Sequence, residues 1–304
     1  AMVAEAKVIC STVGPYLRYG DALVREVAAV GRGYCDLTGE TPFMRQCIDR
    51  YDDIAKTTGA RIVHACGFDS IPSDLGCLMV QEQALADHGA PCDGVRFVLL
   101  RSRGGFSGGT AASMLEVLSR LGDAATRKVL FDPYSLDPEG SPRGPDGRDP
   151  QGVSFDRDLQ RFVGPFMMAP VNTRVVRRSH ALLGHPWGEG FAYGERQAHG
   201  SGLGGAVRAL TVTGTMSAFN MALMVPPARA LLSRFVLPDP GQGPSQEERE
   251  AGFFTAAVIG HGRDPAGQPF RVRGEVAGTR DPGYGETAKM LGESALCLAR
   301  DSAA

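Results

Sequence analysis

The sequence has few of the features that mark specialised classes of protein. None of its apolar runs reaches the about 18 residues that a membrane-spanning helix needs. Its seven cysteines are an odd number, and no two of them have the C-x-x-C spacing of zinc and redox sites. Its net charge is −2, so there is no basic excess to hold a nucleic acid backbone. These absences argue against a membrane-spanning, disulfide-stabilised, zinc-binding or nucleic-acid-binding protein.

Targeting and metal-binding signals are scarce as well. The chain does not start with a basic segment followed by a long apolar one, so we predict no signal peptide and a cytoplasmic location. The histidines are scattered without metal-ligand spacing, so we predict no metal site. His64 lies in an apolar run, which predicts a core residue with satisfied hydrogen bonds. The triplet Arg174, Arg177 and Arg178 is interpreted as a solvated face of a helix or strand.

The sequence does contain a regular alternation of elements up to residue 91. The chain has 304 residues, of which 43% are hydrophobic, and this is enough for two domains. Strands are expected at residues 7–11, 34–37 and 61–66, and helices at 21–30, 41–58 and 73–86. Short connections between alternating strands and helices predict an α/β fold with a Rossmann-like parallel sheet over residues 1–91.

Beyond residue 92 the strict alternation is lost. Strands are expected at 95–100, 191–197, 256–260 and 270–276, and helices at 110–121 and 281–299. Residues 132–152 are rich in Pro, Gly and Asp and predict a long surface loop. We therefore expect an α+β second domain over residues 92–280 with a mostly antiparallel sheet. Residues 281–304 are expected to form a helix that packs back on the first domain.

Unusual residues follow the predicted strands of the first domain. The turn Gly14-Pro15-Tyr16 follows the first strand, residues 38–40 follow the second, and Gly67-Phe68-Asp69 follow the third. Ligands of open α/β sheets bind outside the carboxyl ends of the strands, so these turns are candidates for contacts with a nicotinamide cofactor. The alternative is that they are ordinary strand-to-helix turns and helix caps.

A third cluster lies near the end of the sequence, at residues 281–290. Its Asp-Pro-Gly turn precedes a helix, and Tyr284 and Lys289 are candidate proton donors or groups that polarise a carbonyl. The alternative is a surface turn with a solvated Lys289.

The first strand unit lacks the glycine-rich turn, G-x-G-x-x-G, that binds the phosphates of a dinucleotide. The one match, at residues 200–205, has no clear preceding strand and is interpreted as a flexible loop. We therefore expect that the chain begins partway through its cofactor-binding domain, with the phosphate-binding loop and the first strands missing.

Residues 216–237 are strongly apolar and are broken by Pro226-Pro227. A pair of core helices is the favoured interpretation. The alternatives are an apolar wall for a long acyl substrate or a shallow, peripheral membrane contact.

Five runs along the chain resemble a known family. They are VGPYLRYGDALV (13–24), YCDLTGE (34–40), ARIVHACGFDSIPSDLG (60–76), SGGTAASMLE (107–116) and DPGYGETAKMLGESALCLA (281–299). They resemble the saccharopine dehydrogenase-like oxidoreductases, and most of all the bacterial, mycobacterial-type branch that includes the trans-acting enoyl reductases. The resemblance implies NADP as cofactor, with NAD as the alternative, and a homodimer. It also implies that Gly14, Pro15 and Tyr16, and then Gly67, Phe68 and Asp69, lie near the nicotinamide, but it supplies no catalytic residue.

Three functions follow as hypotheses. The first is NADPH-dependent reduction of an activated double bond, as in an enoyl thioester on a carrier protein or a small molecule, in which Tyr16, Tyr284 and Lys289 would polarise the carbonyl or donate the proton. The second is an amino-acid dehydrogenase with a saccharopine-like substrate. The third is a non-catalytic, lipid-associated protein that uses residues 216–237.

Overall fold

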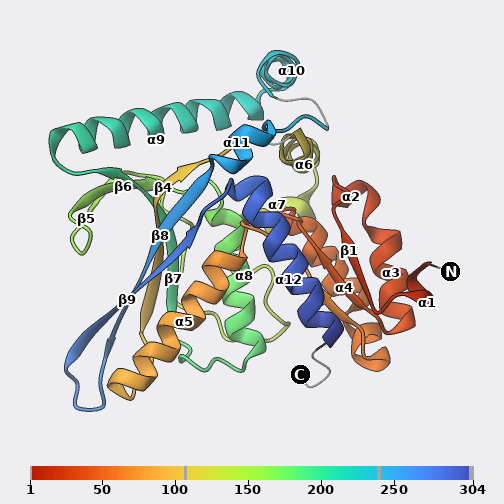
Figure 1. Cartoon of the computed structure of the whole chain (residues 1–304), viewed down its shortest axis with the longest axis horizontal. Helices are drawn as coiled ribbons and strands as arrows, with labels where there is room; N and C mark the ends of the chain where they lie inside the picture. The colour runs from red at the N-terminus through yellow and green to blue at the C-terminus, as the bar shows by residue number, and fades with distance from the viewer. Residues whose placement is uncertain (1, 106–107, 238–240, 301–304) are drawn as a thin grey trace.

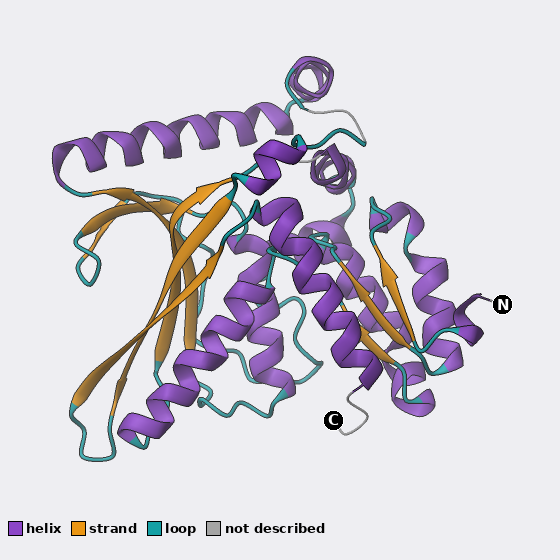
Figure 2. Ribbon diagram, in the orientation of Figure 1, coloured by secondary structure: helices purple, strands orange, loops and turns teal. Residues whose placement is uncertain are grey.

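Two β-sheets organise the chain, and helices separate and flank them (Figures 1 and 2). The computed structural model describes residues 2–105, 108–237 and 241–300. The first sheet is parallel and has three strands, whereas the second is mixed, mostly antiparallel, and has six. The predicted fold class, an α/β chain with a parallel sheet and a second, mostly antiparallel sheet, is confirmed.

The parallel sheet has the strand order β1-β2-β3, which is also the order in the sequence. Its strands are β1 (Val8–Ser11), β2 (Gly33–Asp36) and β3 (Arg61–Val63). The surrounding helices are α1 (Met2–Glu5), α2 (Tyr16–Tyr19), α3 (Asp21–Val30), α4 (Thr41–Thr58) and α5 (Ile71–His88). Gly31 and Gly59 end α3 and α4 at φ angles of 70° and 76°, a left-handed conformation that favours glycine.

Alternate residues of β1 and β2 face two different helical layers. Ile9 and Tyr34 pack with α3 and α4 on one face. On the other face, Cys35 packs with Leu291 of α12 (Thr287–Arg300), the helix that crosses β1 and β2. A π-helical turn, Pro282–Glu286, leads into α12. The C-terminal helix therefore completes the core of the sheet formed by the start of the chain.

The mixed sheet has the order β5-β6-β7-β4-β8-β9, and within it only β4 and β7 pair in parallel. Its strands are β4 (Gly94–Arg103), β5 (Ser154–Asp156), β6 (Arg161–Pro165), β7 (Ala192–Gly200), β8 (Phe253–Arg263) and β9 (Pro269–Gly278). The helices α5 and α8 (Ala169–Leu182) pack against this sheet and bury its main apolar cluster. The remaining helices are α6 (Gly108–Ser119), α7 (Ala124–Phe131), α9 (Gly202–Met224), α10 (Pro226–Phe235) and α11 (Gln246–Glu250).

The glycine-rich residues 200–205 form a tight strand-to-helix turn, so the interpretation as a flexible loop without a preceding strand is wrong. Gly200 ends β7 with a φ of 110°, and α9 begins at Gly202. A Cβ on Gly205 would lie 2.3 Å from the carbonyl oxygen of Gly200. Gly200 and Gly205 therefore allow the first turn of α9 to pack directly on the end of β7.

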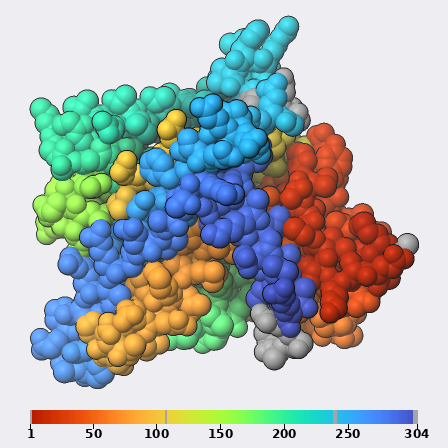
Figure 3. Space-filling view, viewed as in Figure 1, coloured from red at the N-terminus to blue at the C-terminus, as the bar shows by residue number. Residues whose placement is uncertain are grey.

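The preferred interpretation of residues 216–237 as a core helix pair is also wrong. The helix α9 packs on β6 and β7 along one side, and α10 has no buried residue. Figure 3 shows the segment around α10, in cyan, standing out from the rest of this face. We call the exposed apolar side chains of these two helices the α9–α10 face: Leu203, Val207, Leu210, Val212, Met221, Met224, Val225, Leu231 and Phe235.

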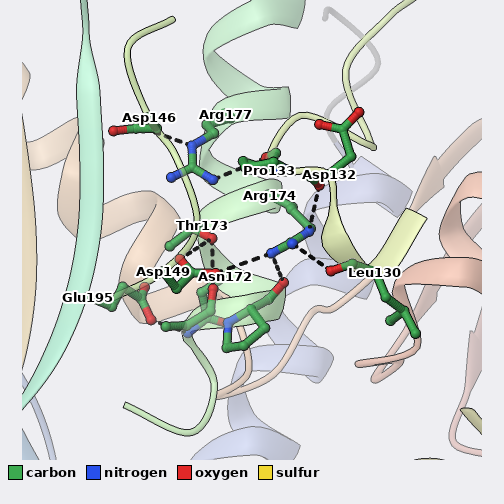
Figure 4. Close-up of polar contacts among 12 residues, drawn as sticks. Leu130, Asp132, Pro133, Asp146, Asp149, Asn172, Thr173, Arg174, Arg177 and Glu195 are labelled. Atoms are coloured by element: carbon green, nitrogen blue, oxygen red, sulfur yellow. Dashed lines mark hydrogen bonds and ion pairs between the residues drawn. The ribbon is translucent and has the colours of Figure 1, made fainter. Parts of the chain in front are cut away.

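Arg174 and Arg177 of α8 are buried and Arg178 is half-buried, which corrects their interpretation as a solvated face. Arg174 and Arg177 are 4% and 5% exposed. The Arg177 guanidinium donates to the Asp146 carboxylate at 2.8 Å, and Arg174 lies 3.4 Å from that of Asp149 (Figure 4). Both guanidinium groups also donate to backbone carbonyls of residues 130–133. The predicted loop 132–152 is confirmed as irregular, and α8 anchors it by charge and hydrogen bonds.

We expect Arg177→Ala to lower the free energy of unfolding by about 3 kcal/mol, because it leaves the poorly exposed Asp146 carboxylate without its cationic partner. Urea denaturation measures this change. The matched control is Arg143→Ala, since Arg143 is 61% exposed and its pair with Asp132 should contribute at most about 1 kcal/mol. Equal losses in the two variants would contradict the assignment of loop anchoring to α8.

Candidate functional site

The carboxyl ends of β1, β2 and β3 meet, and they bring the predicted ligand-facing turns together. The Asp36 carboxylate, at the end of β2, is fully buried and lies at the centre. Its Oδ1 accepts hydrogen bonds from the backbone N–H of Thr38 (3.0 Å) and Ala65 (3.2 Å). Its Oδ2 accepts from the Tyr34 hydroxyl (3.0 Å) and lies 2.8 Å from Nδ1 of His64. A single carboxylate thus ties the turn after β2 to the turn after β3.

A second carboxylate, Glu40, joins the turn after β2 to the turn after β1. It accepts from the backbone N–H of Tyr16 (2.7 Å) and Leu17 (2.8 Å), at the start of α2. The Ser113 hydroxyl of α6 donates to the same carboxylate at 2.7 Å. Burial raises the pKa of Glu40, and these three donors oppose that rise. The motif at residues 34–40 pointed to this region, but Asp36, Glu40 and Ser113 were not among the predicted site residues.

Tyr16 is buried beside Glu40. Its hydroxyl donates to the backbone carbonyl of Ser11 (3.0 Å) and accepts from the N–H of Leu37 (3.3 Å). Burial, together with the charge of Asp36, raises its pKa well above the usual value. These bonds give Tyr16 a positioning role between β1 and β2, and its predicted catalytic role stays a prediction.

The turn after β3 is held partly by the end of the chain. The backbone N–H of Phe68 donates to the Thr287 hydroxyl (3.0 Å), and a Cβ on Gly67 would lie 3.0 Å from Cγ2 of Thr287. The Phe68 ring packs edge-on against Phe254. The half-buried Asp69 forms no hydrogen bond within the described part of the chain, and burial, with the charge of Asp36, raises its pKa to about 6. Asp69 is therefore the titratable group of this turn that is still free to bind a ligand.

The cluster at residues 281–290 combines a buried cap with an exposed lysine. The Asp281 carboxylate is fully buried and accepts from the N–H of Tyr284 (2.6 Å) and Gly105 (2.9 Å). The Lys289 side chain is 72% exposed and lies 3.8 Å from the Glu286 carboxylate. The Tyr284 hydroxyl faces the carbonyl of Gln242. No hydrogen bond or ring contact of the described residues joins any two of Tyr16, Tyr284 and Lys289.

A cavity of about 390 Å³ lies along β3, where α4 and α8 approach each other. We call it the β3 cavity. Its polar lining includes His64, Ser70, Asp74, Arg178 and Ser179. The rest of its wall is mainly apolar, with Met44, Ile48, Ile62, Ile71, Leu136 and Val175.

The prediction that His64 is a core residue with satisfied hydrogen bonds is wrong. Its ring lines the β3 cavity, and its Nε2 is buried without a hydrogen-bond partner among the described residues. Across the cavity, Asp74 accepts from the Ser179 hydroxyl at 2.9 Å, and burial raises the pKa of Asp74 to about 6. Within the described residues, no group of three or more His, Cys, Asp or Glu side chains is arranged to hold a metal ion.

Comparisons with known proteins agree with the predicted branch. A trans-acting enoyl reductase of Mycobacterium ulcerans is 38% identical over 313 residues, which span 99% of this chain and 73% of that protein. One of Mycobacterium tuberculosis is 37% identical over 312 residues, with the same coverage. A second Mycobacterium tuberculosis protein, 42% identical over 313 residues, carries the same name provisionally. The chain belongs to the trans-acting enoyl reductase family.

The wider relationship to saccharopine dehydrogenase-like proteins stays a prediction. No protein-family model matches the chain. No solved structure matches it either. The enoyl reductase relatives support the oxidoreductase class, while the choice of nicotinamide cofactor rests on the sequence prediction.

A buried carboxyl in the mixed sheet should make the stability of the fold depend on pH. Glu195 of β7 accepts from the Tyr193 hydroxyl and from the Asn172 amide, both at 2.9 Å. Burial raises its pKa from the usual 4.5 to about 7. The folded state therefore keeps the proton at a pH where the unfolded state loses it.

We expect the free energy of unfolding to fall as pH rises from about 4.5 to about 7, and to fall less in Glu195→Gln. Urea denaturation at a series of pH values measures both profiles. Because other buried carboxyls titrate in the same range, the difference between the two proteins is the relevant quantity. Parallel profiles would show that Glu195 ionises normally in the folded chain.

Proposed function

We propose that the chain reduces the carbon–carbon double bond of an enoyl thioester, with NADPH as the favoured hydride source and NAD as the alternative. The observation that supports this most is the meeting of three ligand-facing turns at one edge of a parallel sheet, beside a cavity with an apolar wall. The family relationship supports the reaction class. The substrate would be an acyl group on a carrier protein or a small-molecule thioester.

The residues of the turns fit the nicotinamide end of such a cofactor. A Cβ on Gly14 would lie 3.3 Å from the Ser113 hydroxyl, so the turn after β1 packs closely on α6 at this glycine. Asp69 could accept a hydrogen bond from the carboxamide. Pro15, Tyr16, Gly67 and Phe68 would shape the wall, although the N–H of Phe68 is already bonded to Thr287. When bound, the cofactor would supply the hydride.

The chain must then polarise the thioester carbonyl and provide a proton to the α-carbon. Tyr16, Tyr284 and Lys289 are the groups proposed from the sequence. Lys289 has the exposure needed to meet a substrate, whereas the hydroxyl of Tyr16 is already bonded to backbone groups. Lys289, and Tyr284 with its single long contact to the carbonyl of Gln242, therefore suit a direct contact better than Tyr16.

If Lys289 polarises the carbonyl, Lys289→Ala should lower kcat/KM for an enoyl thioester by about 100-fold. The rate is followed by the absorbance of NADPH. Lys128→Ala, a change to another exposed lysine, is the control and should leave the rate unchanged. Wild-type turnover by Lys289→Ala would remove Lys289 from the mechanism.

The alternative of a saccharopine-like amino-acid dehydrogenase has less support. Such a substrate needs several free cations to bind its carboxylates. Arg174 and Arg177 are taken up by aspartates and backbone carbonyls, and Arg178 donates to the carbonyl of Leu136.

We also propose that the α9–α10 face binds an anionic lipid surface, which would keep the protein peripheral to a membrane. Between Glu195 and residue 238 the sequence has no acidic residue, whereas Arg208 and Arg234 are exposed beside the apolar side chains. Apolar groups beside arginine favour the interface of an anionic bilayer. No helix of the described residues is long and apolar enough to cross a membrane. The predicted homodimer is the competing way to cover this face.

Wild-type protein should therefore sediment with phosphatidylglycerol vesicles, and high salt should weaken the binding. Phe235→Asp should reduce it strongly, since Phe235 is 69% exposed, while Leu85→Glu on α5 should not. Absence of vesicle binding, with a dimer mass in light scattering that Phe235→Asp reduces to a monomer mass, would assign the face to a second copy.

A further inference from the structure

The β3 cavity combines a volume and a lining that suit a small ligand. Its volume of about 390 Å³ falls within the range of about 300–1,000 Å³ that small-molecule sites occupy. Twelve of its twenty lining residues are apolar, mostly from α4, β3 and α8, and the polar ones include Asp52, Lys56 and Arg178. The apolar part of the lining suits an acyl chain, and the polar part suits the thioester end.

One of these polar groups, His64, is held in a fixed orientation. Asp36 lies 2.8 Å from its Nδ1, and the same carboxylate receives three further donors, so the carboxylate itself is immobilised. The rings of Tyr34 and Phe43 pack edge-on against the imidazole at 5.8 and 5.4 Å. The side chain therefore has little freedom to turn.

This arrangement assigns different tasks to the two nitrogens of the imidazole. Nδ1–H donates to the carboxylate of Asp36, which leaves Nε2 as the ring nitrogen that another group can meet. Nε2 has no hydrogen-bond partner among the described residues, although it is buried. A buried polar atom without a partner costs free energy. Neighbouring atoms cover Nε2, so a ligand group must displace them to bond with it and remove that cost.

The cavity also lies close to the turn that we assign to the nicotinamide. The ring of Phe43 lies between the rings of Tyr16 and His64, at centroid distances of 5.8 and 5.4 Å. His64 directly follows β3, at the edge of the sheet where the three turns meet. An acyl group in the cavity would therefore have its reactive end near this edge.

We propose that the β3 cavity binds the acyl group of the substrate and that His64, oriented by Asp36, delivers the proton that completes the reduction. This inference rests on the proposed function. Hydride reaches the β-carbon, the electron pair of the double bond moves to the α-carbon through the thioester enolate, and Nε2–H of protonated His64 transfers its proton to that carbon. Neutral His64 then regains a proton from water. Asp36 is a positioning residue, since it acts through His64.

Asp74 is the competing proton donor in the same cavity. It is a carboxyl whose pKa burial raises to about 6, and its Oδ2 already accepts from the Ser179 hydroxyl. His64 and Asp74 line the same cavity, so substituting them separately distinguishes the two assignments.

The binding arm of the test uses octanoyl-pantetheine, which cannot be reduced. Titrated into protein with ¹⁵N-labelled histidine, it should shift the His64 imidazole signals, which are assigned by their absence in His64→Gln. Val175→Trp, which fills the cavity, should abolish the shift, whereas Leu85→Glu should not. A His64 signal that does not respond at saturating ligand would overturn the inference.

The kinetic arm uses trans-2-octenoyl-pantetheine and NADPH. His64→Gln should lower kcat by about 100-fold while the affinity for octanoyl-pantetheine changes little. Asp74→Asn should keep most of the activity, and Asp36→Asn should lower kcat and shift its pH profile. Wild-type kcat in His64→Gln, or a larger loss in Asp74→Asn, would overturn the inference. If protein that binds NADPH in calorimetry does not turn over this substrate, the proposed function fails, and the response of His64 still decides whether the cavity binds acyl groups.

Discussion

The carboxylate of Asp36 is the interaction on which the site depends. It is fully buried, and an ionised carboxyl in such a place is tolerated only if its oxygens are fully hydrogen-bonded. Two backbone amides, a tyrosine hydroxyl and an imidazole meet that requirement, and they come from β2 and from the turns after β2 and β3. Solvating this one charge therefore sets the relative positions of two ligand-facing turns.

Buried ionic groups serve the same purpose away from the parallel sheet. Glu40 joins the start of α2 to α6, and Arg177 joins α8 to the loop 132–152. In both cases a charged side chain fixes a segment whose backbone has no sheet partner. In the Arg177–Asp146 pair, desolvation offsets much of the attraction, so the pair adds less stability than the removal of one partner would cost.

The sequence predicted elements well where local periodicity and glycine caps carry the information. The helices α3 and α4 agree with the predictions to the residue, and Gly31 and Gly59 end them. The predictions of burial failed where polar side chains are buried or apolar side chains are exposed. The arginines of α8 were interpreted as solvated, and the apolar residues of α9 and α10 as core. The motif at 34–40 was recognised, but the partners of Asp36 lie on three segments, and no local pattern reveals such a convergence.

The bond between Phe68 and Thr287 spans 219 positions of the sequence. Together with the packing of α12 on β1 and β2, it makes the first sheet dependent on residues far later in the sequence. The parallel sheet therefore cannot complete its core until α12 has been synthesised. The nascent chain must carry an uncovered apolar face until synthesis reaches α12, and contacts of such long range slow folding. The apolar face that carries Cys35 is thus the part of the first sheet most open to wrong contacts during biosynthesis.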